Sequence, residues 1–151
     1  MGYENILVAV DIADEAEQLL SAAQELVADE KCTLSIITVM RPITDFYVNI
    51  NLFLAIDSGK NIETDAMKYA STWLSGLATQ FGIDSQNINV VLGDPRAEIQ
   101  RVAENTQSDL IVIGSHERYG VGRVLGSTAQ SLLNRIHCDV LVVKLLRSDA
   151  G

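Results

Sequence analysis

The chain has 151 residues, 48% of them hydrophobic, with two prolines and two cysteines. That length fits one domain spanning 1–151, and the composition excludes a disordered chain. Twenty acidic against eleven basic residues give a formal net charge of −9, which opposes binding to nucleic acid or to an anionic membrane surface.

The amino-terminal segment MGYENILVAVD has no basic region, and its apolar run is far shorter than the roughly 20 residues of a membrane span. We therefore expect a cytoplasmic protein. Cys32 and Cys138 lie far apart with no clustered metal ligands around them. They are expected to be small core residues in a reducing compartment, and they signal no zinc or redox site.

Apolar runs of strand length alternate with helical stripes along the chain. Strands are expected at 5–10, 32–40, 87–92, 109–113 and 138–143, and helices at 16–27, 62–81, 95–103 and 124–136. Gly82 is typical of a helix end, and Asp94 followed by Pro95 is typical of a helix N-cap and first position. Tyr69 and Trp73 fall on a helical apolar stripe, which predicts that both are core residues.

This alternation indicates the α/β class. Strands that are apolar on both faces, separated by amphipathic helices, predict a single-domain, doubly wound, open parallel five-stranded sheet with four helices, a Rossmann-like fold. Such sheets bind ligands beyond the carboxyl ends of their strands, where the strand order reverses. The candidate residues are therefore Asp11, the stretch from Val39 to Arg41, and the loop after Ile113.

The segment from Arg41 to Gly59 is an unusually long and apolar connection of about 19 residues. It is compatible with a lid over a site, an additional short helix or a surface for a protein partner. These three alternatives remain open from the sequence.

The stretch GSHERYGVGRVLGSTAQSLL, residues 114–133, is rich in glycine. Its glycine spacing and position do not match a dinucleotide fingerprint, and it contains no G-x-x-x-x-G-K-[ST] phosphate loop. Gly126-Ser127-Thr128 at a helix start offers backbone N–H groups, hydroxyls and a positive helix end, and Arg118 and Arg123 can add charge-assisted contacts to a phosphate. The same residues also suit a simple helix cap after a turn, so both interpretations stay open here.

Several motifs together resemble the universal stress protein family over the whole chain. They are NILVAVD, ITV at the end of the second strand, GDPR at 93–96, SDLIVIGSH at 108–116, LGSTAQSLL at 125–133 and HCDVLVVK at 137–144. The resemblance implies a small cytoplasmic stress-response protein with the adenine-nucleotide alpha hydrolase-like fold. It also implies a homodimer formed through the last strand, Cys138–Val143.

The ATP-binding branch of that family carries G-x-x-G, nine residues and G-[ST]. Gly114 and Gly126-Ser127 match this pattern, whereas Glu117 replaces the second glycine and the loop is one residue shorter. The resemblance implies that ATP or AMP, with or without Mg²⁺, binds at a set of residues that includes the loop. This set is Ala9, Val10, Asp11, Val39, Ile113, Gly114, Glu117, Arg118, Arg123, Gly126, Ser127 and Thr128, with Asp11 near the ribose and Val39 near the adenine.

Glu117 is the residue that can overturn this interpretation. A carboxylate about 4 Å from a phosphate charge repels it by roughly 1 to 4 kcal/mol, unless an arginine or Mg²⁺ offsets the charge. Three functions therefore remain: a nucleotide-binding regulatory protein, a non-binding dimeric adaptor that captures a protein partner, and an ATPase or adenylate-transferring enzyme. The enzyme ranks last because the sequence shows no metal-binding acidic pair and no activated nucleophile. His116 has no serine or cysteine nucleophile spaced around it, and both His116 and His137 are expected to be structural.

Overall fold

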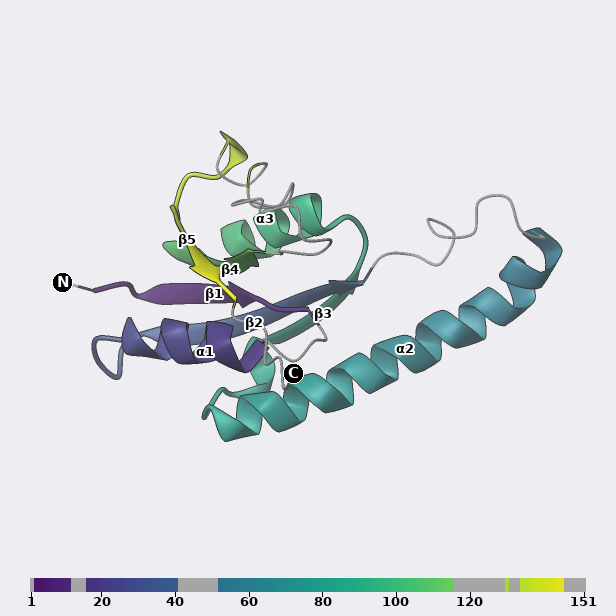
Figure 1. Ribbon diagram of the computed structural model, residues 1–151, viewed down its shortest axis with the longest axis horizontal. Helices are drawn as coiled ribbons and strands as arrows, with labels where there is room; N and C mark the ends of the chain where they lie inside the picture. The colour runs from purple at the N-terminus through teal and green to yellow at the C-terminus, as the bar shows by residue number, and fades with distance from the viewer. Residues whose placement is uncertain (1, 12–15, 41–51, 116–129, 131–133, 146–151) are drawn as a thin grey trace, which may run out of the picture.

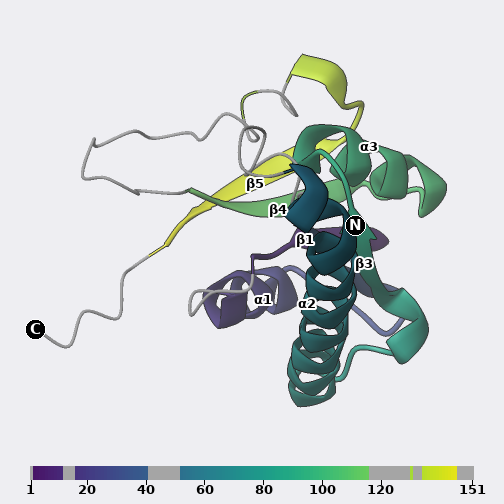
Figure 2. The same ribbon diagram turned by 90° about the vertical axis from the view of Figure 1, so that its right-hand side faces the viewer.

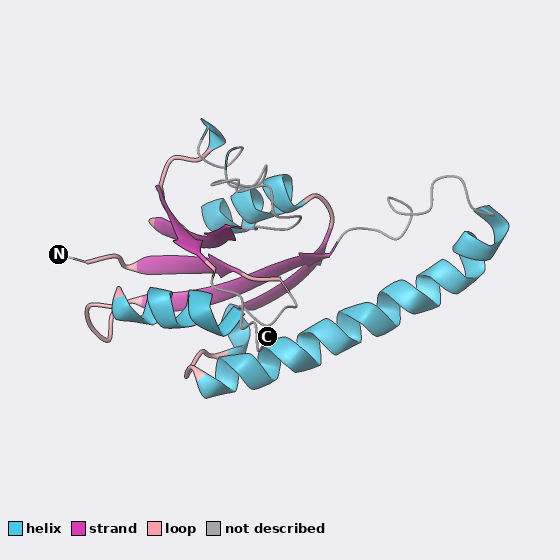
Figure 3. Cartoon of the chain, in the orientation of Figure 1, coloured by secondary structure: helices cyan, strands magenta, loops and turns pink. Residues whose placement is uncertain are grey.

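The protein is an open parallel sheet with helices on both faces (Figures 1 and 3). The computed structural model describes residues 2–11, 16–40, 52–115, 130 and 134–145, and for residues 52–63 it describes the backbone alone. The strands are β1 (Asn5–Ala9), β2 (Thr33–Met40), β3 (Ile88–Leu92), β4 (Leu110–Ser115) and β5 (Asp139–Lys144). All five lie within two residues of the predicted bounds, so the predicted doubly wound α/β class is confirmed.

The strand order is β3-β2-β1-β4-β5, and every pairing is parallel. The chain first adds strands on one side of β1 and then crosses over to add β4 and β5 on the other side. The order of the strands therefore reverses between β1 and β4, which is where a doubly wound sheet leaves a crevice beyond its strand ends.

Two apolar clusters cover the two faces of the sheet. The first cluster joins the sheet to α1 (Ala16–Glu25) and to the carboxyl-terminal half of α2 (Leu52–Gln80), through residues such as Leu20 and Leu74. The second cluster joins it to α3 (Pro95–Asn105), through Ile99 and Val102. Figure 1 shows α1 and α2 on one side of the sheet and α3 on the other, and Figure 2 shows the same separation from a second direction. The strands are apolar on both faces because both faces are covered.

Helix α2 is longer than the sequence predicts. It begins at Leu52 rather than at residue 62, so residues 52–59 of the expected long connection are helical. The rest of that segment, residues 41–51, lies outside the described residues. In Figure 1 the amino-terminal half of α2 extends past the carboxyl ends of the strands, and only its carboxyl-terminal half lies against the sheet.

The prediction that Tyr69 is a core residue is wrong. Its side chain is 64% exposed, whereas the neighbouring Ala70 is fully buried. Trp73 is half-buried and packs against the first cluster, as predicted. The helix ends as expected before Gly82, which adopts a φ of 69° that favours glycine.

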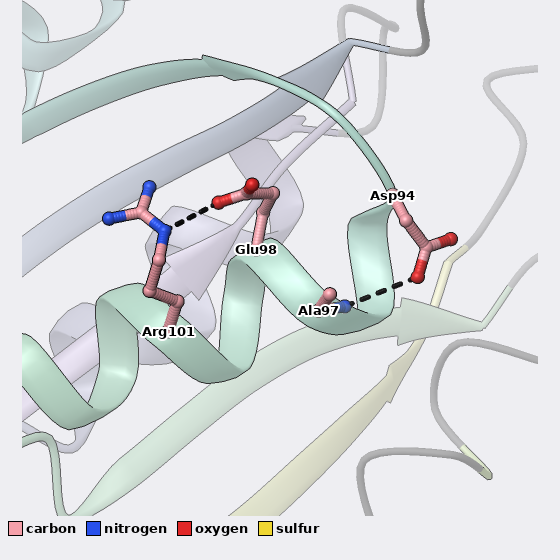
Figure 4. A network of polar contacts seen from close by, with 4 residues as sticks. All are labelled: Asp94, Ala97, Glu98 and Arg101. Carbon is pink, nitrogen blue, oxygen red and sulfur yellow. Dashed lines mark hydrogen bonds and ion pairs between the residues drawn. The ribbon is translucent and has the colours of Figure 1, made fainter.

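Helix α3 begins with the predicted cap (Figure 4). The Asp94 carboxylate accepts the backbone N–H of Ala97 at 3.3 Å, and Pro95 occupies the first turn, where its missing N–H costs nothing. Farther along, the Arg101 guanidinium donates to Glu98 at 2.6 Å. The Arg101 side chain is 53% exposed and the Glu98 side chain 23% exposed, so solvent screens this pair. It contributes less than about 1 kcal/mol, whereas the cap contributes about 1 kcal/mol.

The predicted fourth helix, 124–136, falls mostly outside the described residues. Residues 130, 134 and 135 are helical, and Ile136 and Cys138 pack against the second cluster. The described end of the connection from β4 to β5 therefore lies on the α3 face, which is the side that a right-handed connection requires.

The amino ends of β1 and β4 are tied together by one carboxylate. Asp109 accepts the backbone N–H groups of Glu4 and Asn5 at 2.8 and 2.9 Å. These bonds hold the start of the central strand against a partner 104 positions away.

In the described part of the chain, no helix is long and apolar enough to cross a membrane.

Candidate functional site

The carboxyl edge of the sheet brings together predicted site residues from three strands. Ala9 ends β1, and its Cα pairs with Ile37 of β2 and with Ile113 of β4. Val10 lies just beyond, and its backbone N–H donates to the Ile37 carbonyl at 2.9 Å. The ladder between β1 and β2 thus continues up to the point where β1 leaves the sheet.

Ala9, Val39 and Ile113 share one face. All three pack on the second cluster, where Ile113 is buried and Ala9 and Val39 are partly exposed. Val10 points to the opposite face and is buried in the first cluster, and Asp11 is exposed beyond the end of β1. The edge therefore combines a small apolar surface with a carboxylate next to it.

Gly114 is closely packed against the side chain of Leu145. A Cβ at this position would lie 2.5 Å from Leu145 Cδ1 and 3.0 Å from its Cγ. Ordinary contacts between carbon atoms are about 3.5–4.0 Å. A side chain at position 114 would therefore displace Leu145, which packs against the first cluster.

Ser115 was not among the predicted site residues, and its environment is unusual. Its side chain is 5% exposed, and within the described structure Ser115 Oγ is buried without a hydrogen-bond partner. A buried hydroxyl without a partner costs stability, so such a group calls for an explanation. The only feature of the sequence that points to Ser115 is that a polar residue follows closely after an apolar run.

The remaining predicted site residues lie outside the described residues. They are Glu117, Arg118, Arg123, Gly126, Ser127 and Thr128, and His116 lies there too. His137 is described and is exposed just before β5. Among the residues whose positions are described, no cluster of three or more acidic, histidine or cysteine side chains is arranged to hold a metal ion.

The two thiols lie at the amino ends of strands, away from this edge. Cys32 precedes β2 and Cys138 precedes β5, and both are free. Burial raises the pKa of both thiols above the ordinary 9.0, with a smaller contribution from nearby carboxylates. A raised pKa keeps a thiol protonated. Both side chains are partly buried and pack against the apolar clusters, so they lie at the margin of the core rather than within it as predicted.

The strand order and the edge just described define a doubly wound, Rossmann-like α/β protein. The model of the universal stress protein family matches residues 2–144. Universal stress protein A homolog 1 of Coxiella burnetii is 30% identical over 148 residues, which cover 95% of this chain and 97% of that protein. The chain belongs to the universal stress protein family.

Solved structures with little sequence identity share the fold. The hypothetical protein MJ0577 superimposes with a TM-score of 0.79 at 21% identity, over 98% of this chain and 100% of that one. A universal stress protein in complex with cAMP superimposes with a TM-score of 0.56 at 20% identity, over 95% of this chain and 98% of that one.

Proposed function

We propose that this protein binds an adenine nucleotide, ATP or AMP, beyond the carboxyl ends of β1 and β4, as a regulatory protein rather than an enzyme. The observation that carries the proposal is the reversal of strand order between these two strands. Ala9, Asp11 and Gly114 lie near the carboxyl ends of these two strands, where doubly wound sheets bind ligands. A family member of the same fold forms a complex with cAMP, which is also an adenine nucleotide.

The described edge fits such a ligand. The partly exposed Ala9 and Val39 offer an apolar surface for a planar base, and the exposed Asp11 carboxylate can accept ribose hydroxyls. Phosphate binding is assigned to residues outside the described part of the chain. They are Gly126, Ser127 and Thr128, with Arg118 and Arg123 as sources of positive charge and Glu117 as the opposing charge.

Calorimetric and thermal titrations with ATP and AMP, with and without Mg²⁺, test this proposal. We expect nucleotide to raise the melting temperature, Gly126→Val and Ser127→Ala to weaken that effect, and Glu117→Gly to strengthen it. Gly76→Ala is a matched control, because Gly76 lies on α2 with no atom within 4 Å of an added Cβ. Absence of both heat and stabilisation at millimolar ATP would refute nucleotide binding.

A dimeric adaptor without nucleotide is the second candidate. It is favoured by Glu117 at a glycine position and by β5, which lies at the sheet edge and pairs with β4 alone among the described strands. An uncovered strand edge invites pairing with a second copy. This candidate predicts a dimer in gel filtration and partner capture that does not depend on nucleotide, and a monomer at micromolar concentration would count against it.

A further inference from the structure

Ser115 and Lys144 lie side by side on the carboxyl edge of the sheet. They are Cα partners in the parallel pairing of β4 with β5. Paired residues of parallel neighbours project to the same face. Val140 and Val142, which alternate with Lys144 on β5, pack on the second cluster, as do Ile111 and Ile113, which alternate with Ser115 on β4. Both side chains therefore belong to the face that carries α3.

The two groups complement each other chemically. Ser115 presents a buried hydroxyl that has no partner among the described residues. Lys144 is exposed and ends the last strand, and no ion pair of Lys144 occurs within the described residues. A hydroxyl can serve either a donor or an acceptor, but a neighbouring ammonium group selects an acceptor that carries negative charge.

We propose that Ser115 and Lys144 contact a phosphate group of the nucleotide, with Ser115 Oγ donating to a phosphate oxygen and the Lys144 ammonium group supplying charge. This inference rests on the proposed function and extends the phosphate site to two described residues, Ser115 at the start of the glycine-rich stretch and Lys144 at the end of β5. It accounts for the hydroxyl, because a buried polar group without a partner in the free protein gains one when the ligand binds.

A positive group at this place matters because the protein carries a net charge of −9. An anionic ligand must overcome that overall repulsion through local contacts. Arg96 is the other described cation near a strand end on this edge, and it lies 3.7 Å from the Asp94 carboxylate, which offsets its charge. Lys144 has no such counter-charge in the described structure.

The test compares ATP with adenosine, which lacks phosphate, on wild type, Ser115→Ala and Lys144→Met. We expect Ser115→Ala to weaken ATP binding about 10- to 100-fold, the loss of a hydrogen bond to a charged group, and Lys144→Met to weaken it about 5- to 10-fold. The salt dependence of ATP affinity should fall in Lys144→Met. Adenosine should behave the same with all three proteins.

The ligand-free proteins provide the second readout. Ser115→Ala removes a buried hydroxyl without a partner, so it should keep or raise the melting temperature, by about 2–4 °C at most. Ser35→Ala, a buried serine in the middle of β2, and Lys31→Met, an exposed lysine before β2, are the matched controls and should leave ATP affinity unchanged.

The outcomes separate this inference from the proposed function. If wild type binds no nucleotide, the proposed function itself fails. If wild type binds ATP while Ser115→Ala binds it equally well and melts at a lower temperature, Ser115 is structural and the inference is wrong. Equal losses for adenosine and ATP would place the contact on the nucleoside and would also overturn it.

Discussion

Replacement of Gly114 by alanine should destabilise the protein through one identifiable clash. The new Cβ would stand 2.5 Å from Leu145 Cδ1, so Leu145 must move by about 1 Å or more to restore an ordinary contact. Overpacking of this kind costs about 1–3 kcal/mol, which for a chain of this size corresponds to a fall in melting temperature of about 2–12 °C.

Urea unfolding of four variants measures this effect. Gly76→Ala, on an exposed face of α2, should instead stabilise the protein by about 0.5–1 kcal/mol, because alanine favours the helix and meets no neighbour. Combining Gly114→Ala with Leu145→Ala should cost less than the sum of the two single changes, because the second substitution removes the clashing atoms. Strictly additive losses, or Gly114→Ala as stable as wild type, would refute the packing explanation.

Three further predictions concern the helix cap and the amino edge of the sheet. Asp94→Ala should lower the free energy of unfolding by about 1 kcal/mol and Asp94→Asn by less, as urea denaturation can show. The hydrogen bond to Asp139 raises the pKa of the Tyr3 hydroxyl above 10.0. The contribution of this bond to the stability of the protein is therefore complete below pH 10 and is lost as the pH rises through the pKa of Tyr3 in the folded protein. An alkaline titration of stability should show this loss in wild type but not in Tyr3→Phe. Burial raises the pKa of Cys32 and Cys138, so both thiols should react with a disulfide reagent near pH 8 more slowly in the native protein than in urea, and equal rates would contradict this.

The strands were predictable from the sequence because each is an apolar run bounded by polar turns. The start of α2 was not, because residues 52–56, LFLAI, are apolar on every side and Gly59 follows shortly after, where propensity favours a break. The prediction that Tyr69 is buried was wrong for a related reason. Apolar residues spaced by three and four do not indicate which of two adjacent residues faces the sheet. In the structure Ala70 is buried and Tyr69 is exposed.

The place of the candidate site was predictable to the same extent as the fold. The carboxyl ends of apolar strands can be read from the sequence, which identified Asp11, Val39 and the loop after Ile113 as candidates. Ala9 was implied only by the family resemblance. The pairing of Ser115 with Lys144 could not be read, because it depends on the register between two strands separated by a crossover. The close approach of Leu145 to Gly114 depends on that same register.

The tie between Asn5 and Asp109 also constrains how the chain folds. The central strand lies at the start of the chain, yet one of its neighbours comes from more than 100 positions later. During synthesis, β1 can pair with β2 early, but its other edge stays unpaired until most of the chain has been made. Such long-range parallel pairing is slow, and it leaves an apolar strand edge open to aggregation in the meantime. The strand at the centre of the finished sheet is thus the one whose edge stays open longest while the chain is being made.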